Sequence, residues 1–68
     1  DFLTRTVLRQ LVETFSVSIT ARTDPETGMV AMVARTEDGE SRWTAEAEDK
    51  YLAACRLAQA MGFALEGT

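Results

Sequence analysis

The segment from Trp43 to Phe63 constrains the fold of this chain more than any other, because its hydrophobic period changes within it. Over residues 43–47 apolar and polar side chains alternate, as they do in a strand with one buried face. The apolar residues that follow recur with the spacing of one helix face: Tyr51, Ala54, Cys55, Ala58, Met61 and Gly62. The segment therefore predicts a half-buried strand that leads directly into an amphipathic helix.

The ends of this last helix are also marked. Asp49 is expected to be the N-cap, because its carboxylate accepts hydrogen bonds from free backbone N–H groups and lies at the positive end of the helix. Gly62 can adopt the left-handed conformation that closes a helix, and Phe63 is expected to fold back on it.

A first helix is predicted over residues 4–15, where apolar residues again mark one face: Val7, Leu8, Leu11, Val12 and Phe15. Thr4 or Asp1 is expected to cap it. Two more alternating segments and two turns with Pro or Gly separate the helices. These elements are a strand from Val17 to Arg22, a turn at 24–28, a strand from Met29 to Arg35, a turn at 37–40 and a strand from Ser41 to Ala47.

Connections this short make neighbouring strands pair antiparallel. The chain, residues 1–68, is therefore predicted to be a single α+β domain with the order α-β-β-β-α, a three-stranded antiparallel meander packed against two helices. Trp43, the largest side chain that points inward, is expected to anchor the centre of the core. The inner sheet face is expected to carry Val17, Ile19, Val30, Met32, Ala34, Trp43 and Ala45.

The central strand is apolar on its second face too. Met29, Ala31 and Val33 point away from the predicted core, between Ser or Thr on one neighbouring strand and Arg or Thr on the other. Either a helix or a partner covers them, or the strand simply tolerates small apolar residues there. A domain of this size buries only about 60% of the surface of its unfolded chain, so added stability from a second copy is expected. We therefore predict that these three residues form an interface.

The residue content argues against enzyme chemistry. The chain has no His and a single Cys, so its Ser residues have no His to activate them. Cys55 is expected to be a buried, inert thiol. The acidic groups at 37–40 and 46–49 are interpreted as a solvated turn and a helix cap, since neither has the ligand spacing of a calcium loop. We expect no catalytic residue, no cofactor and no metal site.

Charge and hydropathy limit the partners. Seven basic and eleven acidic residues give a net charge of −4, which repels a phosphate backbone. Apolar runs are too short for a membrane span, and no signal peptide is recognisable. The chain is expected to be a soluble cytoplasmic protein. Because it begins at Asp1 rather than Met, we expect a trimmed protein or a piece of a longer one.

The predicted element order is also that of the double-stranded-RNA-binding domain. Such domains contact phosphates through Lys residues at the start of their last helix. Here residues 46–50 contain one basic residue, Lys50, and three acids. Charge therefore argues against RNA binding, which remains an alternative function. A second alternative is an acidic mimic of nucleic acid that inhibits a nucleic-acid-binding protein.

The segment from Trp43 to Arg56 resembles the end of the phage ABA sandwich domain family, whose typical run is Trp-x-Ala-x-Ala-x-Thr-Pro-x-Leu-Ala-Ile-Cys-Arg. Asp49, Lys50 and Ala54 replace the Thr, Pro and Ile of that run. The matching residues are Trp43, Ala45, Ala47, Leu52, Ala53, Cys55 and Arg56. The resemblance implies a phage or prophage origin and a compact α/β module, and it offers no active-site residues to carry over to this chain. The expected function is that of a non-catalytic interaction or structural module that forms a homo-oligomer or binds another protein.

Overall fold

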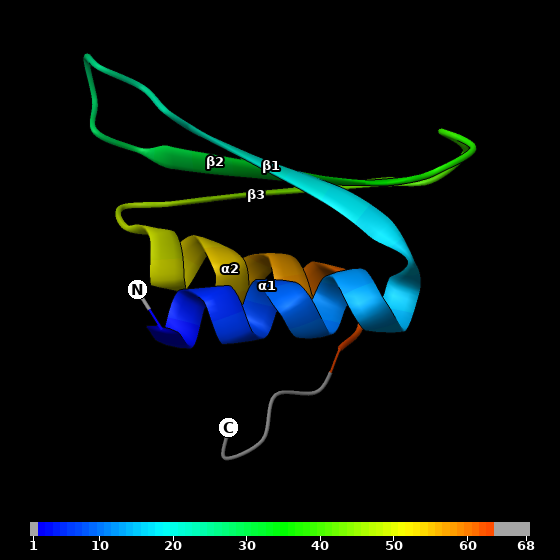
Figure 1. The fold of residues 1–68 in the computed structure, drawn as a ribbon. Helices are drawn as coiled ribbons and strands as arrows, with labels where there is room; N and C mark the ends of the chain where they lie inside the picture. The colour runs from blue at the N-terminus through cyan, green and yellow to red at the C-terminus, as the bar shows by residue number, and fades with distance from the viewer. Residues whose placement is uncertain (1, 64–68) are drawn as a thin grey trace.

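The computed structural model describes residues 2–63 and shows two helices on one face of a three-stranded sheet (Figure 1). The elements are α1 (Phe2–Phe15), β1 (Val17–Thr23), β2 (Val30–Thr36), β3 (Arg42–Ala47) and α2 (Lys50–Ala60). The strands pair antiparallel in the order β1-β2-β3. The predicted α+β class and the α-β-β-β-α order are therefore confirmed.

The first helix begins earlier than its pattern predicted. α1 starts at Phe2, so Thr4 lies within its first turns, where it is only 3% exposed. The prediction that Thr4 caps the helix is wrong. Thr4, Val7 and Leu11 are spaced so that they share the buried face of α1, and this spacing requires that the helix already be formed at Thr4. The other expected cap, Asp1, lies outside the described residues.

The two turns of the meander form as predicted. In the first turn the Asp24 side chain accepts a hydrogen bond from the Glu26 N–H at 2.8 Å, and Gly28 has a φ of 76°, which favours glycine. In the second turn the Thr36 N–H donates to the Ser41 carbonyl at 3.1 Å. β2 and β3 each begin one residue later than expected, at Val30 and Arg42.

Both ends of α2 agree with their predicted caps. The Asp49 carboxylate accepts a hydrogen bond from the Leu52 N–H at 2.9 Å. At the other end Gly62 has a φ of 79°, and its N–H and that of Phe63 donate to the carbonyls of Gln59 and Ala58. This is the Schellman arrangement, in which a left-handed residue lets the last carbonyls of the helix find donors.

The centre of the core lies between α1, β2 and α2, where Leu11, Met32 and Leu57 are fully buried. Trp43 is only partly buried, so the prediction that it anchors the core centre is wrong. Its ring packs against Phe15 with 6.4 Å between centroids, and Phe15 packs against Phe63 at 6.1 Å. Trp43 therefore lies beside the C-terminal end of α1, away from the centre of the core.

Candidate functional site

No helix or strand of residues 2–63 covers the face of the sheet away from both helices, and we call it the open face. Pairing of the strands places its side chains in three rows across the sheet, each row containing one residue from each strand. The first row is Arg22, Ala31 and Glu46, the second is Thr20, Val33 and Thr44, and the third is Ser18, Arg35 and Arg42. Side chains of successive residues alternate between the faces of a strand, so the neighbours of these residues along β2 face the core.

The predicted interface residues lie on this side of the molecule. Ala31 and Val33 belong to the open face and are half-buried between the neighbouring strands. Met29 precedes β2 and lines a shallow depression of about 280 Å³ with Ala31 and Glu46. The structure therefore places the three residues together at one side of the sheet.

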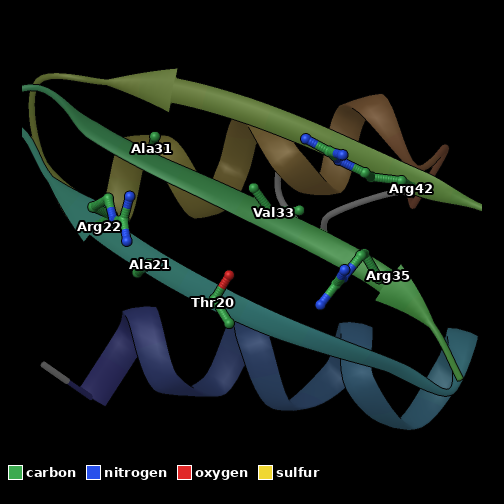
Figure 2. A pocket seen from close by; sticks show the side chains of 7 residues that line it. All are labelled: Thr20, Ala21, Arg22, Ala31, Val33, Arg35 and Arg42. Carbon is green, nitrogen blue, oxygen red and sulfur yellow. The ribbon is translucent and has the colours of Figure 1, made fainter. Parts of the chain in front are cut away.

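The surroundings of Val33 are basic, which reasoning from hydrophobic spacing missed. A second open depression, of about 470 Å³, is lined by Arg22, Arg35 and Arg42 together with Thr20 and neighbouring small residues (Figure 2). Arg35 follows Val33 by two positions, so the alternation that placed Val33 on this face could also have identified Arg35. The open face carries three positive side chains and one negative, whereas the whole chain has a net charge of −4.

Two of these arginines form an unfavourable pair. Arg35 and Arg42 lie directly opposite one another on β2 and β3. Like charges in this position destabilise a sheet by a few tenths of a kcal/mol. Figure 2 shows that their guanidinium groups point to opposite sides of β2. Within residues 2–63 neither group forms a hydrogen bond or ion pair, so both are available to an anionic group from outside.

Acidic turns border the open face at both ends of the strands. The turn between β1 and β2 contains Asp24 and Glu26, and the turn between β2 and β3 contains Glu37, Asp38 and Glu40. Asp38 accepts hydrogen bonds from the Glu40 N–H at 2.9 Å and the Thr36 hydroxyl at 2.7 Å, and these bonds lower the pKa of its carboxyl below 3.8. This carboxylate therefore shapes its own turn.

The remaining candidates lie on α2. Cys55 is partly exposed, so the prediction of a buried thiol is wrong, because this position lies at the margin of the buried face formed by Ala54 and Ala58. The thiol holds the pKa of the Tyr51 hydroxyl above 10.0 through a hydrogen bond and through repulsion between the two groups. Arg56 donates a hydrogen bond from Nη1 to the Glu46 carbonyl at 2.9 Å, so its guanidinium lies against β3.

The part of the chain that the structure describes contains neither a metal cluster nor a membrane-spanning helix. There, no group of three or more Cys, Asp or Glu side chains is arranged to hold a metal ion. No helix within residues 2–63 has the length and apolar character that a membrane span requires.

In comparisons with known proteins, no family model, curated protein or solved structure matches the chain.

Proposed function

We propose that this chain is a non-catalytic interaction module that binds a second copy of itself through the open face of its sheet. The observation that carries the proposal is the unequal cover of the two sheet faces. Both helices pack on one face (Figure 1). At the middle of the other face Val33 and Ala31 line a depression that no helix or strand of residues 2–63 covers. A second copy would shield these side chains from water.

The composition of the open face suits an interface. Arginine is enriched at protein interfaces because its stem packs against apolar groups while its guanidinium forms several hydrogen bonds. Here three arginines surround Val33, and hydroxyl groups of Thr20 and Thr44 flank it. A small domain without a disulfide gains stability from association, since ligand binding to the folded state opposes unfolding.

We also propose that the module is cytoplasmic and of phage or prophage origin. The support for this origin is the resemblance of residues 43–56 to the end of the phage ABA sandwich family. In that setting a small homodimer would serve as a structural or adaptor component, and its activity would consist of contacts alone.

Nucleic acid is the second candidate partner, and the three arginines are the observation in its favour. Two features weigh against it. The start of α2, where a double-stranded-RNA-binding domain presents Lys residues, has Glu48 and Asp49 before Lys50. A polyanion that ran along the strands would also meet the acidic turns at both ends of the open face.

Association can be tested with Val33→Lys. This substitution places a charge at the middle of the open face, where it would have to be buried against the second copy. We expect analytical ultracentrifugation to show a reversible dimer for the parent and a folded monomer for the variant. The expected rise in the dissociation constant is more than about tenfold, or about 1.4 kcal/mol.

The matched control is Val12→Lys, which makes the same chemical change on α1, where Val12 is 39% exposed. The control should sediment like the parent. A parent that stays monomeric at the highest concentration that it tolerates would contradict the proposed function.

A further inference from the structure

We propose that the two copies pack with their open faces together and their strands antiparallel, so that Arg42 of each copy meets Glu46 of the other. This inference rests on the proposed function, and it adds the orientation of the second copy and the contacts that select it. It follows from the pattern of charge over the three rows of the open face.

Two copies that pack with their open faces together can be related by a two-fold axis that lies between the two sheets and passes over the centre of the middle row. A two-fold axis that crosses the strands at Val33 places the first row of one copy over the third row of the other, while the middle rows face each other. Val33 then meets Val33 at the axis. Arg42 meets Glu46, Arg35 meets Ala31, and Ser18 meets Arg22.

The alternative axis, parallel to the strands, gives a less favourable contact. Each row would then face the same row of the second copy in reversed strand order, so Arg22 would meet Glu46, but Arg35 would lie directly over Arg35. Opposed like charges at an interface are costly because burial removes the water that screens them. The antiparallel arrangement places no like charges directly opposite each other, so charge selects it.

The antiparallel arrangement also relieves the repulsion within each copy. Arg35 and Arg42 are paired across β2 and β3, and their guanidinium groups lie on opposite sides of β2 (Figure 2). The Glu46 carboxylate of the second copy would lie over Arg42, where its negative charge also lowers the repulsion between Arg42 and Arg35. Since a guanidinium group pairs best with a carboxylate, one acidic side chain would offset an unfavourable pair.

The size of the face sets the strength of the complex. Three strands of six or seven residues form a face of roughly 20 Å by 15 Å, an area of about 300 Å². Each partner in a standard interface buries about 800 Å², so the open face is a small interface. The dimer should therefore dissociate on dilution. The acidic turns lie beyond the three rows and remain in solvent, where salt screens their repulsion.

Reversal of charge tests the orientation. Arg42→Glu and Glu46→Arg should each raise the dissociation constant of the dimer about tenfold or more, because each creates two like-charge contacts. When the two monomeric variants are mixed, all contacts between positions 42 and 46 are again of opposite charge. We expect the mixture to form a heterodimer with an affinity within about threefold of the parent's, measured by ultracentrifugation with one variant labelled.

The two positions are four residues apart on one strand, about 13 Å, so rescue in the mixture can arise only between copies. Arg5→Glu on α1 is the control for a change in net charge and should leave the dimer intact. Far-UV circular dichroism shows whether each variant is folded. A variant that does not fold is replaced by Arg42→Gln or Glu46→Gln, which should each weaken the dimer without a like-charge contact.

The outcomes separate this inference from the proposed function. If Val33→Lys abolishes the dimer but the mixture is not rescued, the face is right and the antiparallel orientation is wrong. A monomeric parent overturns both. If this monomeric parent also binds a fluorescent oligothymidylate in a salt-dependent way, and Arg35→Gln/Arg42→Gln does not, the open face binds nucleic acid instead of a second copy.

Discussion

Ser16 joins α1 to β1 with a φ of 53°, the left-handed conformation that glycine adopts most easily. A residue with a Cβ is strained by roughly 1–2 kcal/mol in this conformation, and glycine is not. Glycine also raises the entropy of the unfolded chain, which cancels part of that gain in stability. We therefore expect Ser16→Gly to raise the free energy of unfolding by about 0.5 kcal/mol, measured by urea denaturation. Ser18→Gly, within β1, should lower it. A loss in both variants would mean that the Ser16 side chain itself stabilises the connection.

Single residues of the candidate site were only partly predictable. Ala31 and Val33 were correctly assigned to the second face, because strict alternation along β2 leaves no other choice. The opposition of Arg35 to Arg42 depends on the pairing register, which the turn at 37–40 sets and which hydrophobic spacing alone does not reveal. The basic character of the face therefore needed the strands to be paired first.

At the scale of elements, the sequence predicted those whose ends carry a physical signal. Asp49 and Gly62 mark the ends of α2 because each satisfies backbone groups that the helix leaves free. α1 was predicted to start too late because Thr4, a residue type typical of caps, is instead buried on its inner face. A cap and a buried threonine have the same letter in a sequence, and only packing distinguishes them.

The turn between β2 and β3 contains a carboxyl group, that of Asp38, whose protonation affects stability. Hydrogen bonds from the Glu40 N–H and the Thr36 hydroxyl lower the folded-state pKa of Asp38, so their contribution to stability is present above about pH 3.8 and is lost as the pH falls through the folded-state value. Thr36→Val removes one donor. We expect the pKa of Asp38 to rise toward 3.8, as followed by NMR titration of the carboxyl carbon. Glu40→Ala keeps both donors and should leave this pKa low.

At the scale of the whole molecule, small side chains form a large part of the core. Alanines of β2, β3 and α2 are fully buried, namely Ala34, Ala47, Ala53, Ala54 and Ala58. Small residues allow close approach of α2 to the sheet but contribute little buried apolar area each. The few large buried side chains, Leu11, Met32 and Leu57, therefore carry much of the hydrophobic stabilisation. This concentration could not be predicted from spacing, which marks the inward face of each element but not which residues the helices cover.

The same distribution predicts an order of stability among core variants. Leu57 is fully buried between α2 and the sheet, so Leu57→Ala should lower the free energy of unfolding by about 3 kcal/mol through lost burial and a cavity. Trp43→Ala should cost less, although tryptophan is the larger side chain, because its ring is partly exposed and its main contact is Phe15. Urea denaturation of both variants at one protein concentration, kept constant because a dimer's stability depends on it, measures the difference. If Trp43→Ala proved the more destabilising, the aromatic contacts with Phe15 would carry more of the core's stability than their partial burial indicates.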